Sequence, residues 1–189
     1  MKKILLIAII LSSLLPAFSS PGTIVTYTID PEKNAYDHNN KGIMYVEEKC
    51  YYAAIQEFKI AISLNPKTQA TAVYYNNLGK VYMTIGYPEL ALDCFENALT
   101  QYSLNFEYYQ NLVDCYKRLG KTQEKLALYR QKNDNPIAKV MLGLLEEQAG
   151  DKKKAVITLD EFAHTEPDLI ITPAVKKHIQ KLVDEINQI

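Results

Sequence analysis

Apolar residues recur at three- and four-residue steps through most of the chain, in short stretches that glycine or proline separates. Leu78, Tyr82 and Ile85 mark one such stretch, and Leu92 and Phe95 begin the next. This spacing places the apolar side chains on one face of an α-helix. A glycine between the stretches ends the first helix, and a proline at the start of the second costs no hydrogen bond there. The pattern therefore predicts pairs of short amphipathic helices.

The helix pairs repeat along the chain with the same offsets between small and aromatic residues. In the best-formed copy, Gly79 is followed by Tyr82, Ala91, Phe95 and Ala98. The equivalents of Gly79 in the other three copies are Gly42, Val113 and Gly143. Small residues allow two helix axes to approach within about 8–10 Å. Because one pair cannot bury its apolar face alone, four pairs in series predict a stack with one continuous core.

The segment Tyr75-x-x-Leu78-Gly79-x-x-Tyr82, followed by Ala91 and Phe95, resembles the tetratricopeptide repeat family, whose motif recurs every 34 residues. The fold expected is all-α: a right-handed superhelical solenoid of about four such helix pairs with a C-terminal capping helix. The expected boundaries are 35–68, 72–105, 106–135 and 136–169 for the pairs and 170–189 for the capping helix.

The copies depart from the family pattern at several places. Lys41 stands at a leucine position in the first copy, and Glu146 at the tyrosine position in the fourth. We expect Glu146 and Glu147 to lie on a solvated helix face. The third copy spans only about 30 residues before the next begins, so its second helix is expected to be shortened or tilted. Tyr74 and Tyr108 are expected to be partly exposed.

Two dipeptides predict where the outer helices begin. Asp30-Pro31 is typical of a helix start, although residues 20–34 as a whole are best described as an extended N-terminal segment. Thr172-Pro173 predicts the start of the capping helix, with Thr172 as the N-cap residue.

Residues 1–19 carry the pattern of a secretory signal peptide. Lys2 and Lys3 precede an apolar run of twelve residues, and small residues follow Pro16. Twelve helical residues reach about 18 Å, short of the roughly 30 Å hydrocarbon layer. The segment predicts a periplasmic or secreted protein. An uncleaved N-terminal anchor stays open as the alternative, and only then is membrane contact expected.

Composition and motifs argue against several functional classes. A formal net charge of −1 gives no basic surface for nucleic acid. His38, His164 and His178 lack metal-site spacing, and no nucleophile elbow or phosphate-binding loop is present. The sequence predicts a non-enzyme without metal or cofactor.

The three cysteines, Cys50, Cys94 and Cys115, show no metal-site spacing either. Either one pair forms a disulfide, or Cys94 and Cys115 pack as buried thiols, which the helical pattern favours.

A row of asparagines is the candidate binding site. Asn40, Asn77 and Asn111 each lie two residues before the glycine or valine position, so they come into line on the concave surface. Lys80 and Asp114, three residues further on in their copies, are expected to face the same groove. Carboxamides carry a donor and an acceptor and can bond to an extended peptide backbone. The family resemblance implies such a role; packing between helices is the alternative.

The sequence thus predicts an exported scaffold that binds a protein or peptide partner through its concave groove, as an adaptor or assembly factor in the cell envelope. The alternative is a structural spacer or oligomerisation module that binds through its convex face or its ends. If the groove hypothesis holds, Asn77→Ala with Asn111→Ala is expected to weaken binding without lowering the melting temperature.

Overall fold

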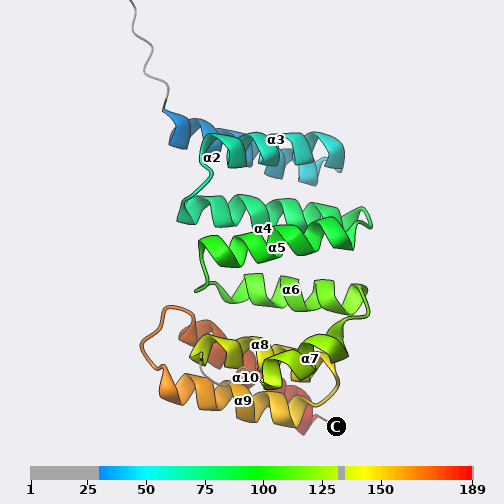
Figure 1. Cartoon of the computed structure of the whole chain (residues 1–189), viewed down its shortest axis with the longest axis vertical. Coiled ribbons are helices and arrows are strands. Elements are labelled where there is room, and N and C mark those ends of the chain that lie inside the picture. Colours follow the sequence, from blue (N-terminus) through cyan, green and yellow to red (C-terminus); the bar gives the residue numbers. More distant parts are fainter. Residues whose placement is uncertain (1–29, 132–134, 189) are drawn as a thin grey trace, which may run out of the picture.

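The computed structural model describes residues 30–131 and 135–188, and the regular secondary structure in these ranges is entirely helical (Figure 1). The helices are α2 (Pro31–Glu47), α3 (Tyr51–Leu64), α4 (Gln69–Thr84), α5 (Pro88–Gln101), α6 (Phe106–Arg118), α7 (Thr122–Arg130), α8 (Pro136–Gln148), α9 (Lys152–Thr165) and α10 (Thr172–Asn187). In the described ranges α2 to α9 form four consecutive pairs stacked in file along the long axis, and α10 follows α9 at the C-terminal end. The predicted all-α solenoid is confirmed; the signal-peptide prediction lies outside the described residues.

The outer helices begin close to where the dipeptides predict, with two corrections. The Asp30 side chain accepts a hydrogen bond from the Lys33 backbone N–H at 3.0 Å, and Pro31 opens α2. The description of residues 31–34 as extended was therefore wrong, because this cap and the first-turn proline start a helix. Thr172 was also misassigned: Ile171 is the N-cap of α10, and the Thr172 hydroxyl instead donates to the Glu166 carbonyl at 2.5 Å.

Glycines end the first helices of three pairs, as the pattern predicts. Gly86, Gly120 and Gly150 have φ angles of 85°, 67° and 94°, a left-handed conformation that costs glycine little. In the first pair Lys49 holds the same place with a φ of 61°.

Tyr74 and Tyr108 are buried, so the expectation that they are partly exposed was wrong. Tyr74 of α4 packs with Ala35 of α2 and Ala61 of α3. The two alanines leave room for the ring between one pair and the next, and Tyr108 does the same one pair later. Each of these tyrosines thus packs between one helix pair and the next.

The third pair is irregular, as its shortened sequence predicts. Its second helix, α7, has nine residues, whereas α3 and α5 have fourteen each. α7 packs more on α8 than on its own partner α6, and α8 lies directly against α6. Figure 1 shows α7 tilted out of the regular file.

Two departures from the family pattern have different physical explanations. Lys41 lies on α2, which has no helix before it in the described part of the chain, so this position faces water. Glu146 is instead 0% exposed, which overturns the prediction of a solvated face. Its carboxylate accepts a hydrogen bond from the Thr158 hydroxyl at 2.6 Å and lies 3.2 Å from the Lys154 ammonium. A buried polar pair replaces the tyrosine of the other copies.

The cysteines are free thiols, and Cys94 and Cys115 are buried, as the packing alternative predicts. The Cys115 thiol donates to the Pro88 carbonyl at 3.1 Å. Burial raises the pKa of Cys94 to about 12 and that of Cys115 to about 11. Across the described ranges, none of the helices is both long and apolar enough to cross a bilayer.

Candidate functional site

The first helices of the pairs place the predicted site residues on one side of the stack. Ile43 and Val46 of α2 and Asn77 and Lys80 of α4 line the same recess, which has a volume of about 220 Å³. Residues seven apart lie on the same face of a helix. Tyr36 therefore shares the face of Ile43 on α2, and Val73 that of Lys80 on α4.

Asn77 and Asn111 each pair with an asparagine of the preceding first helix. Asn77 Nδ2 donates to Asn39 Oδ1 at 2.9 Å, and Asn111 Nδ2 donates to Asn76 Oδ1 at 2.8 Å. Asn39 and Asn76 are buried, whereas Asn77 and Asn111 are half-buried. One side-chain N–H of Asn77 and one of Asn111 are thus used in packing between helices, as the alternative prediction states. In the sequence these partners are the first members of the doublets Asn39-Asn40 and Asn76-Asn77, whereas the repeat offset predicts the second members as site residues.

Asn40 is half-buried and belongs to neither of these pairs. The row that the sequence predicts is thus two bonded pairs that step from α2 to α4 and from α4 to α6. It ends at α8, where Met141 stands in the position of Asn77 and is buried.

Lys80 of α4 forms an ion pair with the next first helix, α6. Its ammonium lies 3.0 Å from Glu107 Oε1 at the start of α6. Burial alone would raise the pKa of Glu107, but the Lys80 hydrogen bond and charge, with hydrogen bonds from Asn111 and Asn76, lower it overall. Lys80, Glu107 and the second asparagine pair thus form one polar network.

Asp114 lies apart from this network, in a cavity of about 200 Å³ that Leu144, Glu147 and His178 also line. Gln148 Nε2 approaches Asp114 Oδ1 at 3.4 Å. Burial raises the pKa of Asp114, and the nearby Glu147 charge adds to this, while Lys117 and Arg118 act against it. The structure therefore separates Asp114 from the other predicted site residues.

A cleft between α6 and α10 was not predicted from the sequence. Two cavities of about 420 and 400 Å³ share Phe106, Gln110 and Ala174, and the second continues through His178 and Lys181 into the Asp114 cavity. We call this continuous space the α6–α10 cleft. A repeat motif describes contacts within the array, so it gives no signal for what a terminal helix lines.

His178 fixes α10 in this position. Its Nε2 donates to Glu147 Oε2 on α8 at 2.7 Å, and its ring lies 5.2 Å from the Phe106 ring on α6, centroid to centroid. A single buried side chain thus connects three helices, so the walls of the cleft are held in place.

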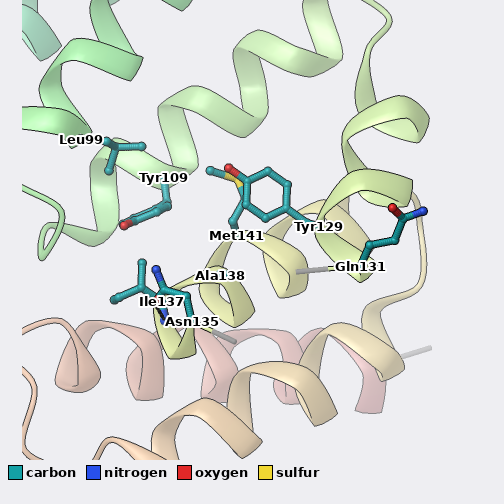
Figure 2. Close-up of a pocket in the computed structure, with 8 residues that line it drawn as sticks. All are labelled: Leu99, Tyr109, Tyr129, Gln131, Asn135, Ile137, Ala138 and Met141. Carbon is teal, nitrogen blue, oxygen red and sulfur yellow. Dashed lines mark hydrogen bonds between the residues drawn. The ribbon is translucent and has the colours of Figure 1, made fainter. Parts of the chain in front are cut away.

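The irregular third pair leaves a different cavity, of about 450 Å³, where α7 ends early. Figure 2 shows its lining residues, which include Leu99 of α5, Tyr109 of α6, Tyr129 of α7 and Met141 of α8. In α3 and α5 the helix continues for five residues past the position equivalent to Arg130, where α7 ends. The Tyr109 hydroxyl donates to the Ser103 carbonyl at 2.9 Å.

No group of three or more His, Cys, Asp or Glu side chains within residues 30–131 and 135–188 is arranged to hold a metal ion. Glu107 is instead paired with Lys80, and Glu147 with His178.

Comparison with known proteins places the repeat and the fold. Residues 72–102 match the tetratricopeptide repeat family profile, and no curated protein matches the sequence. A tetratricopeptide repeat protein from Parabacteroides merdae superposes with a TM-score of 0.51 at 19% identity, over 82% of this chain and 62% of that one. The MamA protein gives 0.49 at 17% identity over 82% and 93% of the two chains. The second TPR domain of human RPAP3, solved with an HSP70 peptide, gives 0.49 at 18% identity over 62% and 98%. At 19% identity the likeness to the Parabacteroides merdae protein concerns the fold alone.

Proposed function

We propose that this chain, a tetratricopeptide-repeat protein by its matching repeat and its fold, is a scaffold that binds an extended segment of another polypeptide along the concave face of α2, α4 and α6. The proposal rests above all on the apolar side chains that this face leaves in water. Tyr36, Ile43 and Val73 are 59%, 40% and 41% exposed. Exposed apolar side chains gathered beside a recess are typical of interaction surfaces.

The recess between α2 and α4 gives the binding a defined mode. An apolar side chain of the ligand enters between Ile43 and Val46 and contacts Val81 at the bottom. Asn77 donates one N–H to Asn39, and its carboxamide oxygen remains to accept a backbone N–H of the ligand. Because that asparagine is already held by its pair, little side-chain entropy is lost on binding.

Peptides selected from a random display library against the full chain test this proposal. Ile43→Glu places a charge in the recess and should weaken the selected peptides at least about tenfold, which corresponds to about 1.4 kcal/mol. Ile157→Glu, at a 59% exposed position on the second helix α9, is the matched control and should leave affinity unchanged. Loss of binding with Ile157→Glu alone would favour the spacer or oligomerisation module that binds through its convex face.

The groove needs no chemistry of its own for this function. We therefore propose a binding protein rather than an enzyme. Assay of the purified chain for hydrolysis of the peptides selected above, by mass spectrometry, should return them intact; cleavage that Ile43→Glu abolishes would contradict the proposal.

We also propose that the chain acts outside the cytoplasm, in the cell envelope, on the strength of the charged and apolar pattern of residues 1–19. N-terminal sequencing of the chain recovered from its native host should begin near residue 20. A chain that still begins at Met1 would favour the anchored alternative if it is membrane-bound.

A further inference from the structure

Gln110 breaks the pattern of asparagine pairs at the point where the α6–α10 cleft opens. It lies three residues before Val113, as Asn39 and Asn76 lie before Gly42 and Gly79. Those two asparagines accept hydrogen bonds from the next first helix. Here the next helix offers only the buried Met141, so Gln110 has no hydrogen-bond partner among the described residues.

The free carboxamide of Gln110 lies at the centre of the cleft. Gln110 is half-buried, and it is one of the lining residues of all three cavities that make up the cleft. A carboxamide held at such a place has a donor and an acceptor to offer to a polypeptide backbone. The feature points to a ligand that supplies both.

The wall formed by α10 is positively charged. Lys177 and Lys181, one helical turn apart, line the 400 Å³ cavity together with Gln110. Within the part of the chain that the structure describes, Lys177 forms no ion pair. Lys181 approaches Glu185 only at 3.7 Å, and Glu185 is held by Lys152 at 2.7 Å.

Among the described residues, the carboxylates around the cleft leave Lys177 unpaired. Lys80 binds Glu107 at 3.0 Å, and His178 binds Glu147 at 2.7 Å. Asp114 lines the 200 Å³ cavity, where Lys181 also lies, but not the 400 Å³ cavity of Lys177. The 400 Å³ cavity itself has no carboxylate in its lining. An anionic group of a ligand therefore fits beside Lys177 and Lys181 better than a cation does.

The opposite end of the cleft is apolar. Leu104, Ile170 and Ile171 line the 420 Å³ cavity, and Ile170 is 71% exposed at the loop that precedes α10. A ligand side chain as apolar as leucine would cover Ile170 there, and binding would be stabilised because both apolar surfaces leave water. The two ends of the cleft thus favour different side chains of one ligand, an apolar one at Ile170 and an anionic one at Lys177 and Lys181.

We propose that the α6–α10 cleft binds an internal acidic segment of a partner polypeptide, with an apolar side chain on Ile170, a carboxylate beside Lys177 and Lys181, and the backbone bonded to Gln110. This site rests on the proposed scaffold function and extends it, because it gives the ligand a chemical class. It uses α10, which the concave face of α2, α4 and α6 does not.

An array of capped decapeptides tests the assignment. One Leu and two Asp are moved through a Gly-Ser background, and binding of the labelled full chain is measured. Because both ends of each peptide are blocked, binding reports side-chain carboxylates and not a terminal one. Peptides with Leu and Asp close together should bind. Replacement of both Asp by Asn should weaken binding about tenfold or more, because asparagine lacks the negative charge that Lys177 and Lys181 attract.

Variants locate the binding. Lys177→Glu should abolish binding of the Asp peptides and confer binding of matched Lys peptides, and Gln110→Ala should weaken both kinds. Lys176→Glu, one residue away and exposed on α10, is the control for net charge and should have little effect. Circular dichroism verifies that each variant remains helical.

Three outcomes would overturn the cleft assignment: no binding of any acidic peptide, equal losses with Lys176→Glu and Lys177→Glu, or loss with Ile43→Glu but not with Lys177→Glu. The last outcome would leave the proposed groove function standing. Loss of peptide binding with Lys177→Glu and not with Ile43→Glu would instead support the cleft. These peptides would then be no evidence for binding in the groove between α2 and α4.

Discussion

A β-carbon on Gly79 of α4 would lie 2.6 Å from Cε1 of Phe95 on α5, too close for two carbon atoms that are not bonded. The phenyl ring occupies the space that a side chain at Gly79 would need. Gly42 and Phe58 repeat the relationship one pair earlier, at 2.5 Å. The spacing of sixteen residues between a glycine and an aromatic residue thus sets how closely the two helices of a pair approach.

Gly79→Ala should destabilise the fold by about 1–3 kcal/mol through overpacking, partly offset by about 1 kcal/mol of helix propensity. Urea denaturation measures the free energy of unfolding. Phe95→Ala in the same chain removes the ring, so the double variant should lose less than the sum of the two single losses. An increase in stability with Gly79→Ala would show that the close approach does not constrain the pair.

Asn77→Ala should lower stability by about 1–3 kcal/mol, because it leaves the buried Asn39 carboxamide oxygen without its donor. The structure thus reverses the expectation that alanine at Asn77 and Asn111 leaves the melting temperature unchanged. Asn40→Ala is the matched control, since Asn40 joins neither pair, and should shift the thermal midpoint much less. Equal shifts for Asn40 and Asn77 would argue against the paired arrangement.

Lys154→Ala should destabilise the chain by about 1–3 kcal/mol, because the Glu146 carboxylate, fully buried between α8 and α9, would lose its cation. Glu146→Gln added to Lys154→Ala removes the uncompensated charge and should recover part of the loss. Chemical denaturation of the four chains of this double-mutant cycle provides the measurement. If the double variant is no more stable than Lys154→Ala, the ammonium does not compensate the carboxylate.

Alkylation of the folded chain near pH 8 should modify Cys50 and spare Cys94 and Cys115. Cys50 is exposed, whereas the other two are buried and burial raises their pKa values to about 12 and 11, so little thiolate forms. Mass spectrometry of the digested product identifies the modified residue. The same reaction in urea should label all three, which verifies that protection comes from the fold.

Stability should decrease as the pH rises above about 9, the ordinary pKa of these thiols, toward about 12. The unfolded chain releases the thiol protons first, so it binds fewer protons than the folded chain and is favoured by alkali. Buried Tyr109 and Tyr116, whose pKa values burial also raises, act in the same direction. Thermal midpoints across this range in the Cys94→Ala and Cys115→Ala double variant should fall less steeply. An unchanged slope would assign the effect to the tyrosines.

Regular contacts of the array follow from the sequence because each copy repeats the same small and large side chains. The all-α fold, the short α7 and the buried thiols were accessible in this way. Glu146 was not, because a single carboxylate in a helix looks the same whether it faces water or a lysine and a threonine from the next helix.

The candidate site was predicted only in part. Asn77, Asn111 and Lys80 lie together on the first helices, since equivalent positions of a repeat align. Their partners Asn39 and Asn76 and the free carboxamide of Gln110 depend on the register between pairs, which no single copy encodes. The α6–α10 cleft depends further on where the terminal helix packs, and His178 sets this through contacts to residues far away in the sequence.

The most direct test of the account is to map a display-selected peptide onto the ¹⁵N-labelled chain by nuclear magnetic resonance. A ligand held along the concave face should shift the amide signals of Ile43, Asn77 and Lys80 and leave those of the second helices α3, α5 and α9 in place. Shifts confined to these second helices would contradict binding along the concave face and assign it to the convex face.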